Sequence, residues 1–200
     1  ESPVVRLARA SLALRHGFSL SAQALAESLA GSRDDTLRFR GALLAGSAAH
    51  AGSREAVALG FFRDAQKLAP DETARREARW GELMAATALE LPDAPRMLTD
   101  LVRREAGRGQ LRPLDAIREA DKKVALGLRF GAVTTLAESR RSEELLRHVD
   151  NPVVRASFRA TYSCALNLAA EYAAALRVAD DLRDEAEKRR IDFGLPYGPL

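Results

Sequence analysis

Alanine recurs at a fixed interval in the first half of this chain, and this repeat constrains the fold more than any other feature. Ala22, Ala58 and Ala94 lie 36 residues apart, and each lies near the start of an apolar helical stretch that follows a polar break. A period of this size is typical of helical-repeat arrays. The sequence therefore predicts an all-α protein built from helical hairpins.

The second copy of the repeat resembles the tetratricopeptide repeat most closely. Ala58, Phe62, Ala65 and Pro70 reproduce the small, aromatic, small and proline spacing of the second helix in that family, and Gly46 lies twelve residues upstream of Ala58. Two antiparallel helices have room only for small side chains where they cross most closely. We therefore expect Gly46 at such a crossing and Phe62 in the groove beside it. The resemblance implies a right-handed α-solenoid that serves as a binding scaffold.

The order of apolar stretches and polar breaks predicts about five antiparallel helical hairpins in a single repeat domain over residues 1–200. The expected hairpins cover approximately residues 2–31, 34–69, 71–106, 113–149 and 151–193. Ser2, Asp71 and either Asp34 or Asp35 are expected to cap helices, because their side chains accept hydrogen bonds from unpaired backbone N–H groups. The longest break is Gly107-Arg108-Gly109, and the fourth hairpin is the least regular.

The beginning of the chain returns near its end. Ser2-Pro3-Val4-Val5-Arg6 is repeated almost unchanged as Asn151-Pro152-Val153-Val154-Arg155, which predicts that the two copies begin the first and fifth hairpins. The first residues already belong to a helix start, and Pro199-Leu200 resembles the start of a further hairpin, so we expect a fragment of a longer protein. A solenoid cut in this way exposes an apolar face at each end. Self-association could cover these faces.

The helices also resemble the repeat region of large LuxR-type bacterial transcriptional regulators, a group that includes the maltose regulators. The resemblance rests on Ala-, Leu- and Arg-rich helices, on irregular unit lengths, and on the ending Arg190-Ile191-Asp192-Phe193-Gly194-Leu195-Pro196. In that family an ATPase module precedes the repeats and a helix-turn-helix follows them. Neither a phosphate loop nor a DNA-reading helix occurs in this sequence, so neither activity is carried over. The resemblance implies a sensor or docking region for a small effector or a partner protein.

Catalytic and metal-binding patterns are missing from the sequence. His16, His50 and His148 are far apart, and none has a metal-ligand partner three or four residues later. Cys164 is the only cysteine, and a lone helical cysteine is usually a small core residue. A single cysteine also favours a reducing, cytoplasmic compartment. We therefore expect no enzymatic activity, no metal and no cofactor.

The charge and the apolar stretches argue against nucleic-acid and membrane partners. The net charge of +3 is too small to indicate a phosphate-binding surface. Tyr162, Tyr172 and Tyr197 are too scattered to form a stacking platform for bases. The longest uncharged stretch, residues 41–53, is too short to cross a bilayer. We expect neither kind of contact.

The inner surface of the expected solenoid is the remaining candidate site. In tetratricopeptide arrays the first helix of each hairpin lines a concave groove, and this resemblance assigns six residues to it: Arg40, His50, Arg76, Arg79, Leu83 and Asn167. The arginines could clamp an acidic group by bidentate hydrogen bonds. Alternatively, they pair with Glu72, Glu77 or Glu82 on their own or neighbouring helices. A general protein-assembly scaffold without a small-molecule pocket is the other open interpretation.

Overall fold

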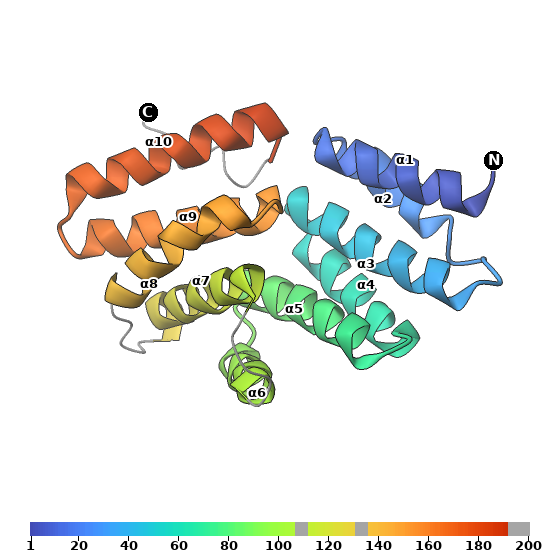
Figure 1. Ribbon diagram of the computed structural model, residues 1–200, viewed down its shortest axis with the longest axis horizontal. Coiled ribbons are helices and arrows are strands. Elements are labelled where there is room, and N and C mark those ends of the chain that lie inside the picture. Colours follow the sequence, from blue (N-terminus) through green and yellow to red (C-terminus); the bar gives the residue numbers. More distant parts are fainter. Residues whose placement is uncertain (107–111, 131–135, 192–200) are drawn as a thin grey trace. The chain divides into compact units, whose positions relative to one another are not determined.

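The computed structural model describes residues 1–106, 112–130 and 136–191, and within these ranges every regular element is a helix (Figure 1). The all-α prediction is confirmed. The solenoid of five right-handed hairpins stays a prediction. The elements are α1 Pro3–Arg15, α2 Ser19–Glu27, α3 Asp35–Ala51, α4 Glu55–Leu68, α5 Glu72–Ala88, α6 Ala94–Ala106, α7 Pro113–Phe130, α8 Leu136–Glu143, the 3₁₀ helix η1 Glu144–His148, α9 Pro152–Leu168 and α10 Tyr172–Arg189.

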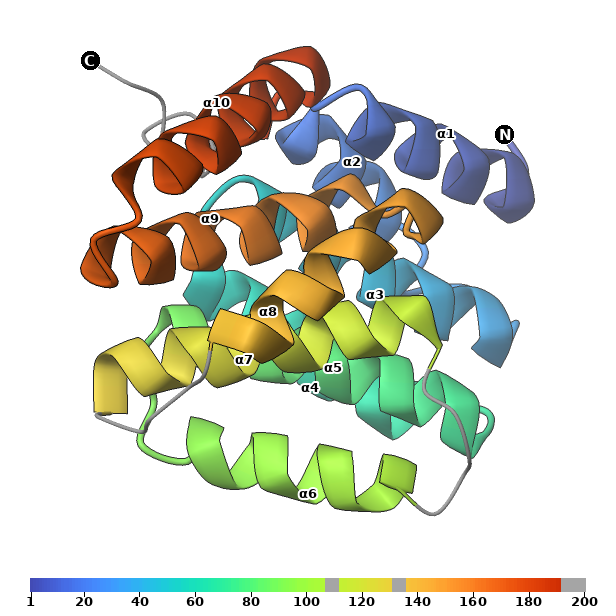
Figure 2. The same cartoon turned by 60° about the vertical axis from the view of Figure 1, so that its left-hand side comes forward.

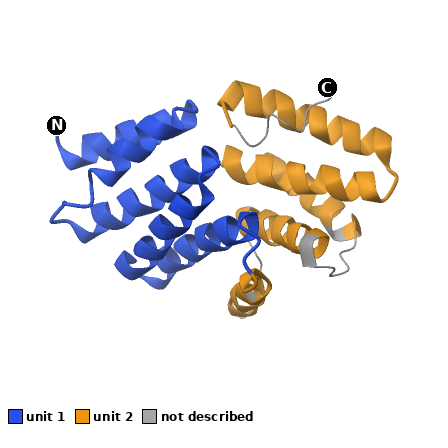
Figure 3. Cartoon of the chain, turned by 180° about the vertical axis from the view of Figure 1, so that it is seen from behind, with its two compact units in different colours: residues 1–91 blue, residues 92–200 orange. Residues whose placement is uncertain are grey.

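The chain divides into two compact units, residues 1–91 and residues 92–200 (Figure 3). Unit 1 contains α1 to α5, and unit 2 contains α6 to α10, so the expected third hairpin of α5 and α6 is split between them. The break at residues 107–109 and the ending at residues 192–200 lie outside the described residues.

The helices begin where the sequence supplies capping side chains. Ser2 Oγ accepts a hydrogen bond from the Val5 amide at 3.4 Å, and Asp34 and Asp71 cap α3 and α5 in the same way. Asn151 Oδ1 caps α9, and a proline follows both Ser2 and Asn151 in the first turn. These side chains satisfy backbone donors that a helix end leaves unpaired. The expected caps are confirmed, with Asp34 rather than Asp35 at the start of α3.

Small residues in unit 1 let the helices approach closely around one aromatic ring. Ala58 is fully buried on α4, and Phe62, one turn later, is buried between glycines of α3 and α5. A Cβ atom on Gly46 would lie 2.8 Å from Phe62 Cε1, and a Cβ atom on Gly81 would lie closer still to the same ring. The expected contact between Gly46 and Phe62 is confirmed. Gly81 was not expected there, and it gives the ring a second glycine wall.

Consecutive helices of unit 1 pack against one another along the chain (Figure 2). α1 contacts α2, α3 contacts α4, and α4 contacts α5. The first helices of the expected hairpins also touch, α1 with α3 and α3 with α5. α3 and α5 are therefore neighbours in unit 1, and the predicted site needs this contact.

Unit 2 is built around α7 and α9. α7 contacts α6, α8, η1 and α9, and α9 contacts α10. The rings of Phe158 and Tyr162 stack at a centroid distance of 5.5 Å, and Ile117 of α7 is fully buried in the same apolar cluster. A second cluster joins α9 to α10. These two clusters hold α9 in the centre of the unit, between α7 and α10.

Candidate functional site

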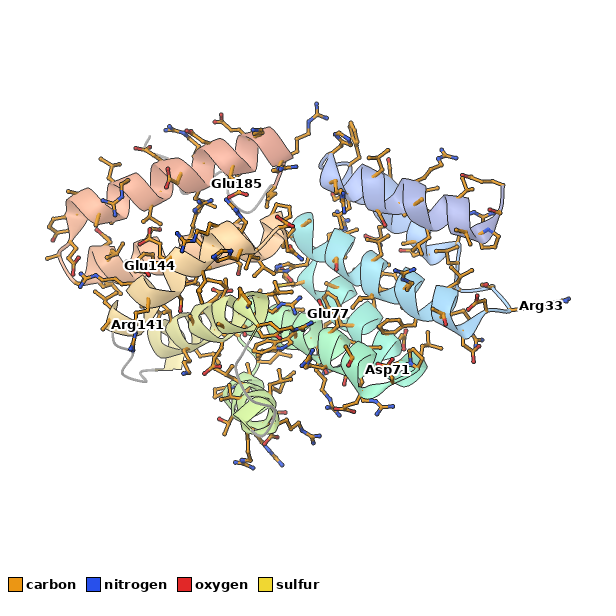
Figure 4. All side chains as sticks on the ribbon, in the orientation of Figure 1. Arg33, Asp71, Glu77, Arg141, Glu144 and Glu185 are labelled. Carbon is orange, nitrogen blue, oxygen red and sulfur yellow. The ribbon has the colours of Figure 1, made fainter. Side chains whose placement is uncertain are left out.

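Three of the predicted site residues lie on a single helix, α5. Arg76, Arg79 and Leu83 occur three and four residues apart, so they project from the same side of the helix. Both arginines are half-buried and Leu83 is fully buried. Figure 4 labels Asp71 at the start of this helix and Glu77 in its middle. The helix therefore combines two cations with an apolar residue that fixes the orientation of that side.

Arg79 shares one carboxylate with Arg75. Arg79 Nη1 lies 2.9 Å from Glu72 Oε1, and Arg75 Nη1 lies 3.1 Å from Glu72 Oε2. Desolvation alone would raise the pKa of Glu72, but the positive charges of Arg79 and Arg75 outweigh it and lower the pKa below its ordinary value. The pairing of a site arginine with Glu72 is one of the two alternatives that the sequence left open. Glu82 instead pairs with Arg63 of α4 at 2.8 Å.

Trp80 lies on the same side of α5 as Arg76 and Leu83, although the sequence did not assign it to the site. It follows Arg76 by one helical turn and is buried, and its indole Nε1 has no hydrogen-bond acceptor among the described residues. A buried N–H without an acceptor costs about 1 to 3 kcal/mol. The spacing of four residues from Arg76 was the available signal in the sequence, because residues four apart lie on the same side of a helix.

α3 carries two further predicted residues, and they differ in exposure. Arg40 is exposed and forms no ion pair within the described part of the chain. His50 is buried, and its Nδ1 lies 2.7 Å from Glu55 Oε2 in the first turn of α4. This contact ties the end of α3 to the start of α4. Arg40 is therefore accessible to a ligand, whereas His50 contributes a connection between two helices; both remain predictions as groove residues.

Asn167 lies in unit 2, in the last turn of α9, and it is exposed. It belongs to a different unit from the arginines of α3 and α5. Its assignment to the same site stays a prediction.

Unit 2 contains a buried polar network that sequence analysis missed. Asp121 of α7 accepts hydrogen bonds from Ser157 Oγ and Thr161 Oγ1 of α9, both at 2.7 Å. Lys122 Nζ lies 2.7 Å from the same carboxylate and donates to Ser157 Oγ at 3.2 Å. Both charged side chains are buried. Each oxygen of Asp121 has a donor, so the network joins α7 to α9 and leaves little capacity for a ligand.

Within the described ranges, no group of three or more His, Cys, Asp and Glu side chains is arranged to hold a metal ion. His16 and His148 lie at helix C-termini, and Cys164 is half-buried in α9. No described helix is long and apolar enough to span a bilayer. No protein-family model, curated protein or solved structure matches this chain. The arginine side chains of the candidate site are cationic and donate hydrogen bonds, so they suit an acidic group.

Proposed function

We propose that this chain is a non-enzymatic binding module, the sensor and interaction region of a LuxR-type transcriptional regulator in the bacterial cytoplasm. The side of α3 and α5 that carries Arg40, Arg76 and Arg79 binds an acidic group of a small effector or of a partner protein. Guanidinium groups present several N–H donors in a fixed plane, which suits carboxylates and phosphates. The contact between α3 and α5 supports a shared surface for these cations.

The single observation that carries this proposal is the charge on two adjacent first helices. Arg40 of α3 is exposed without an ion-pair partner among the described residues. On the neighbouring first helix, α5, Arg79 and Arg75 share the carboxylate of Glu72. One carboxylate between two guanidinium groups leaves a net positive charge. An acidic ligand would lower this repulsion.

A general protein-assembly scaffold is the second candidate function. The pairing of Arg79 with Glu72 favours it, because a cation that already has a partner gains less from a ligand. In the scaffold, the same side of α3 and α5 contacts a protein and holds no small molecule. The remainder of the reading frame separates the two: a phosphate loop before this region and a helix-turn-helix after it would support the regulator.

The binding proposal is tested by thermal unfolding with inorganic phosphate or citrate, against sodium chloride at equal ionic strength. A ligand that binds only the folded state raises the melting temperature by mass action. We expect such a rise in the unchanged chain and its loss in Arg40→Glu and in the double variant Arg76→Glu with Arg79→Glu. Arg33, exposed in the loop before α3 and labelled in Figure 4, supplies the matched control Arg33→Glu, which should keep the rise.

The helical content of each variant is measured by circular dichroism, so that loss of binding can be separated from loss of structure. If the double variant unfolds while Arg40→Glu still responds to phosphate or citrate, the arginines of α5 are structural and the scaffold is favoured. An equal rise in chloride, or an equal loss in Arg33→Glu, would show that the effect is nonspecific charge screening.

A further inference from the structure

Neighbouring hairpins of unit 1 share one packing arrangement, in which the second helix of one hairpin lies against the first helix of the next. α2 packs on α3, where a Cβ atom on Gly41 would lie 2.9 Å from Ala26 O and from Leu29 Cβ. α4 packs on α5 through the ring of Phe62. Each first helix therefore has a side that receives the preceding second helix. Each second helix has a side that receives the following first helix.

On α1, the side that corresponds to the contact of α3 with α2 is exposed. The 36-residue period relates Gly41 on α3 to Val5 on α1. It also relates the buried Ala48 to Leu12. Val5 is 49% exposed and Leu12 is 56% exposed, and Ala8 between them is exposed as well. These three residues lie on one side of the helix, which is called the α1 face below.

In the second copy of the opening sequence, on α9, another helix covers the residue that corresponds to Val5 of the α1 face. Val154 on α9 occupies the place of Val5 in the repeated Pro-Val-Val-Arg segment, and it is only 2% exposed. α7 packs on that side of α9, with Ile117 in the same apolar cluster. The same residues are therefore covered by a helix in unit 2 and open in unit 1.

The side of α10 that would receive a following first helix is also exposed. The repeat frame relates Ala58 of α4 to Ala175 of α10, and both alanines are buried. In this frame Leu59 corresponds to Leu176. Leu59 is 9% exposed, whereas Leu176 is 52% exposed, and Tyr172, one turn earlier, is 66% exposed. Tyr172, Leu176 and Asp180 on this side are called the α10 face.

We propose that copies of this chain associate head to tail, with the α10 face of one copy packed on the α1 face of the next. The contact repeats the relation of α2 to α3 and of α4 to α5 within unit 1. Large exposed apolar side chains on two defined helix sides provide the driving force, because such surfaces mark interaction sites in soluble proteins. The contact uses two different faces and is therefore heterologous.

The charges on the two faces suit this pairing. At the junction of α4 and α5, Arg63 Nε lies 2.8 Å from Glu82 Oε1. The repeat frame places Asp180 of α10 where α4 has Arg63. α1 carries three arginines and no Asp or Glu, so it offers the opposite charge to Asp180. The charges of the two helices are therefore complementary, although Arg9 of α1 also pairs with Glu1 at 2.8 Å. Asp180 also pairs with Arg183 of its own helix at 3.3 Å, so this contribution is modest.

Sedimentation velocity over a concentration series tests the proposal on the full 200-residue chain. We expect reversible association of the unchanged chain. Leu12→Glu on the α1 face and Leu176→Glu on the α10 face should each weaken it by about tenfold or more, since a charge replaces a buried leucine at the contact. Val57→Glu is the matched control, because Val57 is an exposed apolar residue of α4 outside both faces. It should associate like the unchanged chain.

A mixture of the two leucine variants decides between heterologous and symmetric contacts. Each variant keeps one intact face, so the mixture should form a one-to-one dimer at concentrations where the separate variants stay largely monomeric. Failure of the mixture to associate, an effect of only one of the two substitutions, or an unchanged chain that stays monomeric would each overturn the proposal. Leu12→Ser and Leu176→Ser, with circular dichroism, provide the same comparison should a glutamate reduce helical content.

Discussion

Substitution of Gly81 by alanine is the most direct test of how unit 1 is packed. A Cβ atom at this position would approach two ring atoms of Phe62 to well under 3.0 Å, a distance that real Cβ atoms essentially never show. Gly46 of α3 also lies close to the same ring atoms, so two helices confine this part of the ring. Alanine in a helix is favoured over glycine by about 0.5 to 1 kcal/mol, but overpacking a core costs about 1 to 3 kcal/mol. We expect a net loss of about 1 to 2 kcal/mol in the free energy of unfolding.

Gly60 of α4 provides the matched control, because no atom lies within 4 Å of the position that its Cβ would take. Gly60→Ala should therefore show the helix preference alone and stabilise the chain by about 0.5 to 1 kcal/mol. Urea unfolding followed by circular dichroism measures both variants, with the slope as a check on cooperativity. The two alanine substitutions should thus change the free energy of unfolding in opposite directions.

A second substitution locates the cause of the loss. Phe62→Leu shortens the side chain that meets Gly81. In the Gly81→Ala background it should cost less than it does alone, with a coupling of about 1 kcal/mol, as expected for residues in contact. If Gly81→Ala stabilises the chain as much as Gly60→Ala, the ring does not lie against Gly81 and the packing of α4 on α5 described above is wrong.

Three further predictions concern hydrogen bonds and protonation. Thr161→Val removes a donor to the buried Asp121 carboxylate and should lower the free energy of unfolding by about 1.5 to 3 kcal/mol; Thr99→Val, at an exposed hydroxyl, should change it far less in the same urea titration. The lowered pKa of Glu72 means that its pairing stabilises the fold at neutral pH, and that this contribution disappears as the pH falls below the ordinary carboxyl pKa of about 4.3. Glu72→Gln should therefore reduce the fall in the free energy of unfolding that the unchanged chain shows at acidic pH. Burial, helped by Glu143 and opposed by Arg140, raises the pKa of Tyr162; its phenol should resist ionisation in an ultraviolet titration past the ordinary value of about 10, and stability should fall as the pH rises through the raised pKa.

Helix positions and the first close contact were predictable because they depend on neighbours in sequence. The caps Ser2 and Asp71 act on the amides of the next turn, and proline after Ser2 fixes the first turn. Gly46 and Phe62 belong to one hairpin, so a single repeat frame places them together. Gly81 belongs to the next hairpin. Its contact with Phe62 depends on how two hairpins pack, and spacing within one hairpin carries no information about this.

The candidate site was predictable to the level of helix sides and no further. The period places Arg76, Arg79 and Leu83 on one side of α5, and the structure has them in α5 with Leu83 buried. It does not reveal that His50 lies against Glu55, because that contact crosses the turn between α3 and α4. Periodicity gives a direction from the helix axis, whereas burial depends on what lies beyond the side chain.

The polar network of unit 2 shows the same limit more sharply. In sequence, Asp121 and Lys122 resemble a solvated pair on a charged helix, and adjacent residues of a helix do not face one another. Their hydroxyl partners, Ser157 and Thr161, lie 36 and 40 residues from Asp121. Only the packing of α9 on α7 joins them. A buried carboxylate therefore has its donors at positions that no local pattern connects.

The polar network around Asp121 also explains why α10, and not α7, suits the α1 face. Alignment of the two Pro-Val-Val-Arg segments places Ala8 and Leu12 of α1 where α9 has Ser157 and Thr161. If α7 of a second copy packed on α1, Asp121 would lose both hydroxyl donors, and a buried charged group without its partners costs more than the apolar contact returns. α10 presents Tyr172 and Leu176 instead of a charged pair, so it fits the α1 face without this penalty. Hydroxyl groups on α9 and methyl groups on α1 thus separate two helix faces that begin with nearly the same sequence.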